Sequence, residues 1–177
     1  KENVRSLAEA KSGVRKEVLQ LAAFLQLTDL IPVIRPYSKS GNSQAMRWAA
    51  LISLARLGDD SAKAEMMRRV KRLPVTDELV YNVFPDLVFS RSMEAISYLI
   101  EVLESDEKNC ESADAENEAA IPCGYRIMEL LAPVVADFPV ELDETGDVET
   151  NNYPAALSNI RQWYRKNKQL TLELDRY

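Results

Sequence analysis

Residues 45–73 constrain the fold most, because their pattern predicts two helices joined by a tight turn. Apolar residues recur at helical spacing up to Leu57, and Gly58 follows where a left-handed C-cap is needed. Asp59 then offers a side-chain oxygen to the free N–H groups of a second helix, which Pro74 ends. A single hairpin of this kind cannot bury its apolar stripe, so we expect copies stacked beside it.

Weaker copies of this hairpin lie on both sides of it. Upstream, residues 27–34 match its turn and the start of its second helix, and downstream residues 90–100 do the same. If Ile34, Met66 and Leu99 are equivalent, the units follow one another at spacings of 32 and 33 residues. A period of this length is typical of helical repeat arrays, in which neighbouring units bury one continuous core.

With these copies the chain resembles the HEAT-like repeat proteins, which are α-solenoids of stacked helical pairs. The resemblance rests on residues 50–59, of the form ALxxLARLGD, and on residues 94–103, of the form EAIxYLIEVL. In the first unit, Asp29 and Arg35 resemble the turn aspartate and helix arginine of that family. Pro85 falls within a first helix, where the family often has a proline kink. The second and third units lack the aspartate–arginine pair.

The resemblance implies an all-α chain whose helical pairs stack in a right-handed α–α superhelix. We expect one domain of residues 1–177 with about four units. Their approximate bounds are 13–43, 44–74, 75–104 and 122–167. Two acidic insertions without apolar periodicity, at 105–121 and 138–152, interrupt this array. The spacing of the units also requires the first insertion. The first-helix tyrosines Tyr81 and Tyr125 lie 44 residues apart, about 11 more than the repeat period of 33.

The composition removes several classes of catalytic chemistry. The chain has no histidine, which excludes Ser–His–Asp and Cys–His nucleophile systems and the commonest metal ligand. No phosphate loop, dinucleotide-binding glycine pattern or CxxC motif occurs. Catalysis by a carboxylate pair stays open, but no spacing singles out a pair. We therefore expect no enzyme and no cofactor. The alternative is a HEAT-like enzyme or a nucleic-acid-acting protein that uses the concave face, which a buried carboxylate or a continuous positive groove would favour.

The most basic run of the chain has two interpretations. It consists of Arg68, Arg69, Lys71 and Arg72. One helix face with these charges could bind an anionic partner. However, Glu101 stands one repeat period after Arg68, and Glu104 stands one period after Lys71. Equivalent positions of neighbouring repeats lie side by side, so these charges can pair between repeats. Glu65 can also pair with the arginine four residues further along its own helix.

Charge and hydropathy indicate the class of partner. Residues 1–100 hold 15 Lys and Arg against 11 Asp and Glu, whereas residues 101–177 hold 7 against 17. Nucleic-acid binding needs a continuous basic stripe, so we expect no nucleic-acid partner. No apolar run is long enough to span a membrane, so we expect no membrane insertion.

These exclusions leave a non-catalytic protein-binding module or scaffold as the leading hypothesis. A solenoid exposes an extended and rather rigid surface, which suits binding to another chain. In the related folds the second helices line the concave face, and these positions supply the expected contacts. The expected partner-binding residues are Arg68, Arg69, Arg72, Tyr98, Glu101 and Glu104.

The second insertion raises the question of a metal site. Asp143, Asp147 and Glu149 supply hard oxygen ligands around Gly146, which would suit calcium. Their spacing does not fit the EF-hand pattern, and acidic surface loops are usually solvated. We therefore expect no metal, and we expect the long loops to contact a partner instead.

Cys110 and Cys123 stand 13 residues apart and bracket most of the first insertion. Two free thiols in a reducing compartment would fit the sequence, but their positions at the two edges of one loop favour a disulfide. A disulfide favours an extracytoplasmic location, in the cell envelope or secreted, with the cytoplasm as the alternative. The chain starts at Lys1 without a methionine, which fits the removal of an export signal and equally a shortened chain.

Overall fold

A computed structural model describes residues 1–10, 13–112, 119–173 and 175. Within these residues the regular secondary structure is helical, and extended segments form only isolated bridges. This confirms the expected all-α class. The chain divides into two compact units, Lys1–Leu73 with Phe89–Ala95 and Pro74–Val88 with Ile96–Tyr177.

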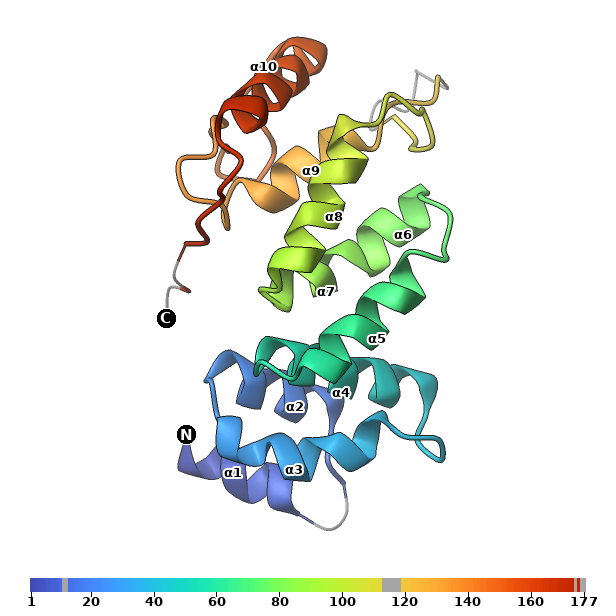
Figure 1. Cartoon of the computed structure of the whole chain (residues 1–177), viewed down its shortest axis with the longest axis vertical. Helices are drawn as coiled ribbons and strands as arrows, with labels where there is room; N and C mark the ends of the chain where they lie inside the picture. Colours follow the sequence, from blue (N-terminus) through green and yellow to red (C-terminus); the bar gives the residue numbers. More distant parts are fainter. Residues whose placement is uncertain (11–12, 113–118, 174, 176–177) are drawn as a thin grey trace. The chain divides into compact units, whose positions relative to one another are not determined.

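The first unit is built around one buried helix. Its elements are α1 (Glu2–Glu9), α2 (Lys16–Phe24), η1 (Thr28–Leu30), α3 (Ile31–Ile34), η2 (Arg35–Ser38), α4 (Gln44–Arg56) and α5 (Asp60–Val70). Helix α4 packs against α2, α3, η2 and α5 (Figure 1). Every residue from 49 to 56 is buried, because neighbours cover α4 on more than one side.

The hairpin of α4 and α5 has the caps that the sequence predicts. Gly58 has φ +94°, the left-handed conformation that a glycine adopts without steric cost. The Asp59 side chain accepts a hydrogen bond from the backbone N–H of Ala62 at 2.9 Å. Its second oxygen lies 2.6 Å from Nη2 of Arg35. Burial alone would raise the pKa of Asp59, but hydrogen bonds from Ser61 and Ala62 and the Arg35 charge together lower it.

The expected second helix of the first repeat forms only in short pieces. The sequence predicts a turn and the start of one helix over residues 27–34, yet the chain changes from 3-10 to α and back to 3-10 geometry between Thr28 and Ser38. Pro32 and Pro36 explain the interruptions, because neither can donate a backbone hydrogen bond and each restricts the residue before it.

The second unit contains helices of 6 to 14 residues. Its elements are α6 (Asp77–Asn82), α7 (Phe84–Phe89), α8 (Met93–Glu104), α9 (Gly124–Leu131) and α10 (Tyr153–Lys166). The last residue of α7, Phe89, and the first three residues of α8, 93–95, belong to the first unit. Thr76 caps α6, with its hydroxyl 3.5 Å from the Leu79 nitrogen. The expected kink lies at Val83, two residues before Pro85, and separates α6 from α7.

The fourth expected hairpin is shorter than its sequence pattern suggests. Helix α9 ends at Leu131, so Val134 and Val135, which continue the apolar pattern, lie beyond it. Pro133 explains this end. Val135 instead forms an isolated bridge with Leu172 near the end of the chain. Residues 113–118 of the expected first insertion lie outside the described residues.

Three turns with similar backbone geometry recur along the chain. Gln26, Gly58 and Arg91 all have positive φ, of 54°, 94° and 53°. Each stands two residues after the end of a helix, and the turns follow one another at spacings of 32 and 33 residues. A side chain makes this conformation costly, and at Gln26 backbone hydrogen bonds from Gln26 to Ala23 and from Leu27 to Ala22 hold the turn in place.

Candidate functional site

The basic run is partly neutralised within its own helix. Arg68 lies 2.6 Å and Arg69 lies 2.7 Å from Oε1 of Glu65. The bond to Arg69 confirms the predicted pair, and Arg68 joins it. Hydrogen bonds from both arginines lower the pKa of Glu65 to about 2. Arg72, beyond the end of α5, is exposed.

The acidic members of the expected site have different surroundings. Glu104 lies 3.1 Å from Nη2 of Arg165 on α10. Glu101, one turn earlier on α8, is exposed and makes no ion pair within the part of the chain that the structure describes. The expected pairs Arg68–Glu101 and Lys71–Glu104 would join the two units and stay predictions.

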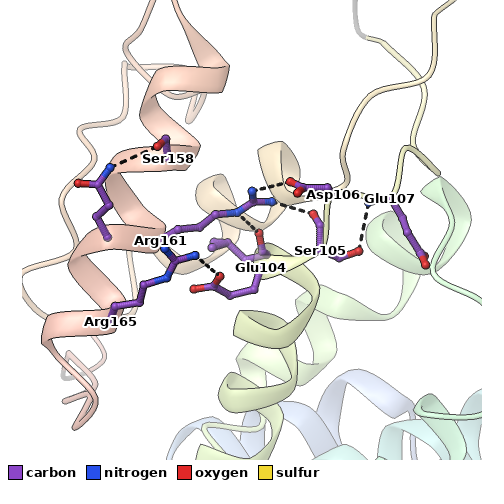
Figure 2. Close-up of polar contacts among 9 residues, drawn as sticks. Glu104, Ser105, Asp106, Glu107, Ser158, Arg161 and Arg165 are labelled. Carbon is purple, nitrogen blue, oxygen red and sulfur yellow. Dashed lines mark hydrogen bonds and ion pairs between the residues drawn. The ribbon is translucent and has the colours of Figure 1, made fainter.

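An arginine from α10 fixes the end of α8 (Figure 2). Arg161 is 15% exposed and donates from Nε to the carbonyl oxygen of Leu103 at 2.9 Å. Its two Nη atoms bond to the carbonyl oxygen of Ser105 at 2.8 Å and to Asp106 at 2.6 Å. The last carbonyls of a helix have no partner within it, so Arg161 caps α8 and anchors the loop that follows.

The loop that starts at Ser105 is fastened at its other end by the cysteines. The sulfurs of Cys110 and Cys123 lie 2.06 Å apart, at disulfide-bond distance, which confirms the predicted pairing. Cys110 and Ile121 also exchange both backbone hydrogen bonds, at 2.8 and 3.2 Å. Within the loop, the Glu107 carboxylate accepts a hydrogen bond from the Asn109 side chain at 3.1 Å. The loop is therefore held at both ends and its carboxylate is oriented.

A cavity of about 180 Å³ lies between α8 and this loop. Its walls are Val75, Tyr98, Glu101, Val102, Ser105, Glu107, Asn109 and Cys123. The Tyr98 ring packs edge-on against buried Phe84, with ring centroids 6.0 Å apart. Burial and the charge of Glu101 both raise the pKa of Tyr98. Tyr98 and Glu101, two of the six expected partner-binding residues, thus meet here with Glu107, which the repeat pattern did not predict.

The size of this cavity limits what it can hold. Pockets for drug-sized ligands and cofactors enclose roughly 300–1,000 Å³. A cavity of about 150 Å³ is large enough for one benzene molecule. The cavity beside Tyr98 therefore suits a single side chain or a similarly small group better than a cofactor.

A second acidic group was missed because nothing in the repeat pattern marks it. Glu129 on α9 has a side chain that is 16% exposed and lies 3.8 Å from Nη1 of Arg126. Burial raises the pKa of Glu129, while Arg126 and a hydrogen bond with Tyr153 act in the opposite direction. Oε1 of Glu129 is buried without a hydrogen-bond partner. The one signal in the sequence is a charged pair three residues apart that brackets the buried Ile127 and Met128.

The acidic turn around Gly146 uses the carboxylate of Asp143 in its own hydrogen bonds. Oδ1 of Asp143 accepts hydrogen bonds from the backbone nitrogens of Thr145 and Asp147 at 2.8 and 3.1 Å. The Thr145 hydroxyl donates to the same oxygen at 2.6 Å, and these bonds lower the pKa of Asp143. No cluster of three or more potential metal-ligating side chains occurs in the described ranges.

None of the helices described is both long and apolar enough to cross a membrane. Comparison with family models, with curated proteins and with solved structures finds no match to this chain.

Proposed function

We propose that this chain is a non-catalytic protein-binding module built of HEAT-like repeats in a right-handed superhelix. The recurring left-handed turns at Gln26, Gly58 and Arg91 support the repeat architecture, because their spacings equal those of the sequence units. Arg35 on the second segment of one repeat also pairs with Asp59 in the turn of the next repeat. Contacts of this kind between successive units are what stacked repeats require.

The observation that carries the binding function is the exposed carboxylate of Glu101. It makes no ion pair within the described residues, and it borders a cavity beside the aromatic ring of Tyr98. Glu65, by contrast, is already paired with Arg68 and Arg69. An aromatic side chain flanked by an unpaired charge on a rigid helix is the kind of anchor on which protein interfaces depend.

Site-specific crosslinking in the native host tests this function. A photoreactive amino acid replaces exposed Ser97, one turn before Glu101 on α8, and in a second variant it replaces exposed Arg72. We expect a discrete crosslinked protein from Ser97, identified by mass spectrometry, and a weaker or absent product from Arg72. A product from Arg72 alone would move the site to the basic run, and no product from either position would contradict the proposal.

Charge reversal of the basic run separates its two interpretations. If Arg68, Arg69 and Arg72 act mainly by pairing, changing all three to Glu lowers thermal stability while the Ser97 crosslink persists. Loss of the crosslink at unchanged stability would assign partner binding to these arginines.

A catalytic role for Glu129 is the second candidate function. Its side chain is only 16% exposed, and burial raises its pKa, which is the direction that a general acid requires. Functional groups of this kind are often retained at the expense of stability. A Glu129→Gln variant that is more stable than the natural chain would favour catalysis. A less stable variant would assign Glu129 to its contacts with Arg126 and Tyr153, which is the result we expect.

We further propose an extracytoplasmic location. Disulfides persist in oxidising compartments and are rare in the cytosol, and Cys110 and Cys123 lie at bonding distance. Intact-mass measurement of protein from the native host, alkylated under denaturing conditions without reductant, tests this. We expect no label on either cysteine. Two labels would mean free thiols and would favour the cytoplasm.

A further inference from the structure

The cavity beside Tyr98 combines three kinds of wall. Val75 and Val102 supply apolar surface, Tyr98 supplies an aromatic ring, and Glu101 and Glu107 supply carboxylates. Both glutamates are exposed, and neither makes an ion pair within the described residues. The cavity is therefore negatively charged at its edge and apolar along part of its lining.

The carboxylate on the loop side is held in place before any ligand arrives. Asn109 donates to Glu107 at 3.1 Å, and the backbone nitrogen of Glu107 donates to the Ser105 hydroxyl at 3.2 Å. Arg161 anchors the start of the loop, and the disulfide from Cys110 closes its end. A preorganised site loses less conformational freedom on binding, so it binds more tightly than a mobile one.

We propose that this cavity binds one lysine or arginine side chain of a partner protein. The inference rests on the proposed protein-binding function and names the partner chemistry that its site would take. A long basic side chain matches all three walls, because its aliphatic stem can lie along the valines while its charged end reaches the carboxylates. The tyrosine ring adds attraction for a cation. A cavity of about 180 Å³ has room for one such side chain.

Other ligands fit the same walls less well. An anionic group would be repelled by Glu101 and Glu107. A calcium ion needs six to eight oxygen ligands, whereas much of this lining is valine and tyrosine. A neutral apolar side chain would leave both carboxylates without a positive counter-charge.

Titration of the whole chain with short peptides, followed by ¹⁵N NMR, tests the proposal. The probes are acetyl-Gly-Gly-X-Gly-Gly-amides in which X is arginine, lysine, citrulline or norleucine. We expect the arginine and lysine peptides to shift the backbone amides of residues 98–109. Citrulline and norleucine, which lack the charge, should bind at least tenfold more weakly, because they cannot form charge-assisted hydrogen bonds with the carboxylates.

Two variants locate the effect. Glu101→Gln should weaken binding of the arginine peptide five- to tenfold, whereas Glu144→Gln, on the exposed second insertion, should leave it unchanged. Reduction and alkylation of the disulfide release one wall of the cavity and should abolish the shifts. The amide resonances of residues 13–73, in the first compact unit, should keep their chemical shifts.

Three outcomes would overturn the inference. Equal binding of norleucine and arginine would make the cavity a purely apolar site. Binding only after Arg68 and Lys71 are changed to Gln would show that the chain's own cations fill it. No shift with any peptide, with the Ser97 crosslink intact, would refute the basic side chain while leaving the protein-binding function in place.

Discussion

Nη1 of Arg56 donates a hydrogen bond to the carbonyl oxygen of Phe89, which stands 33 residues further along the chain. The guanidinium carbon also lies 4.5 Å from the centre of the Phe89 ring and 5.3 Å from that of Phe24. These residues end α7, α4 and α2, so the helix ends that recur along the sequence meet in one cluster, in which Arg56 is buried and both phenylalanines are half-buried. Arg56 is only 6% exposed, and a carbonyl and two rings compensate its charge.

The Arg56 cluster should contribute strongly to stability. Arg56→Met keeps an unbranched apolar side chain but leaves the Phe89 carbonyl without this donor and removes the cation that lies over both rings. We expect the free energy of unfolding, measured by urea denaturation, to fall by about 2–4 kcal/mol. Arg72→Met, at an exposed position, should change it by no more than about 0.5 kcal/mol. Equal effects of the two substitutions would show that the cluster is not a stabilising centre.

If the turns at Gly58 and Gln26 are equivalent, glycine should stabilise both of them. Nothing lies within 4 Å of a Cβ added to Gly58, so Gly58→Ala tests backbone conformation alone, and it should lower the free energy of unfolding by about 1 kcal/mol. Gln26 adopts the same left-handed region with a side chain, so Gln26→Gly should raise it by about 0.5 kcal/mol. Thermal unfolding of both variants measures the difference. A loss of stability at Gln26 would argue against equivalent turns.

The two arginines of α10 should differ although they lie one turn apart. Arg161 is largely buried and caps α8, so Arg161→Met should lower the free energy of unfolding by about 2–3 kcal/mol. Arg165 is 63% exposed where it meets Glu104, so Arg165→Met should cost less than about 1 kcal/mol. The pair of variants forms a matched comparison by urea denaturation. The cap would lose its assigned role if both cost the same.

Acid should weaken the Glu65 cluster in a defined pH range. Arg68 and Arg69 hold the pKa of Glu65 at about 2, below its usual 4.5, so the ionised form stabilises the folded chain above about pH 4.5. This contribution disappears as the pH falls toward 2. Because the cluster is solvated, we expect a loss of only about 1 kcal/mol. Urea unfolding at pH 6 and pH 3 measures it. Glu65→Gln should reduce the pH dependence, and an unchanged dependence would contradict the pairing.

Local signals made much of the fold predictable. Gly58 and Asp59 define a turn within a few residues, so the hairpin of α4 and α5 has the caps that its sequence predicts. The cysteine pairing was predictable too, because Cys110 and Cys123 bracket a single loop. The second segment of the first repeat differs because Pro32 and Pro36 interrupt it, and the repeat pattern alone does not reveal these interruptions.

The candidate site could be predicted only in part, for a physical reason. The positions of Tyr98 and Glu101 follow from the period of α8, so sequence could nominate them. Glu107 joins them because the loop is fixed by Arg161, more than fifty residues away, and by a disulfide. Glu129 depends in the same way on contacts with Tyr153 from another helix. Contacts between distant segments leave no periodic trace.

The most direct test of the protein-binding site on α8 is the affinity for the protein captured by the Ser97 crosslink. Isothermal titration calorimetry compares the natural chain with Glu101→Lys and with Glu144→Lys, which makes the same charge change on the second insertion. We expect Glu101→Lys to weaken binding at least tenfold and Glu144→Lys to leave it within twofold. Equal affinities of all three proteins would show that the surface around Glu101 is not the binding site.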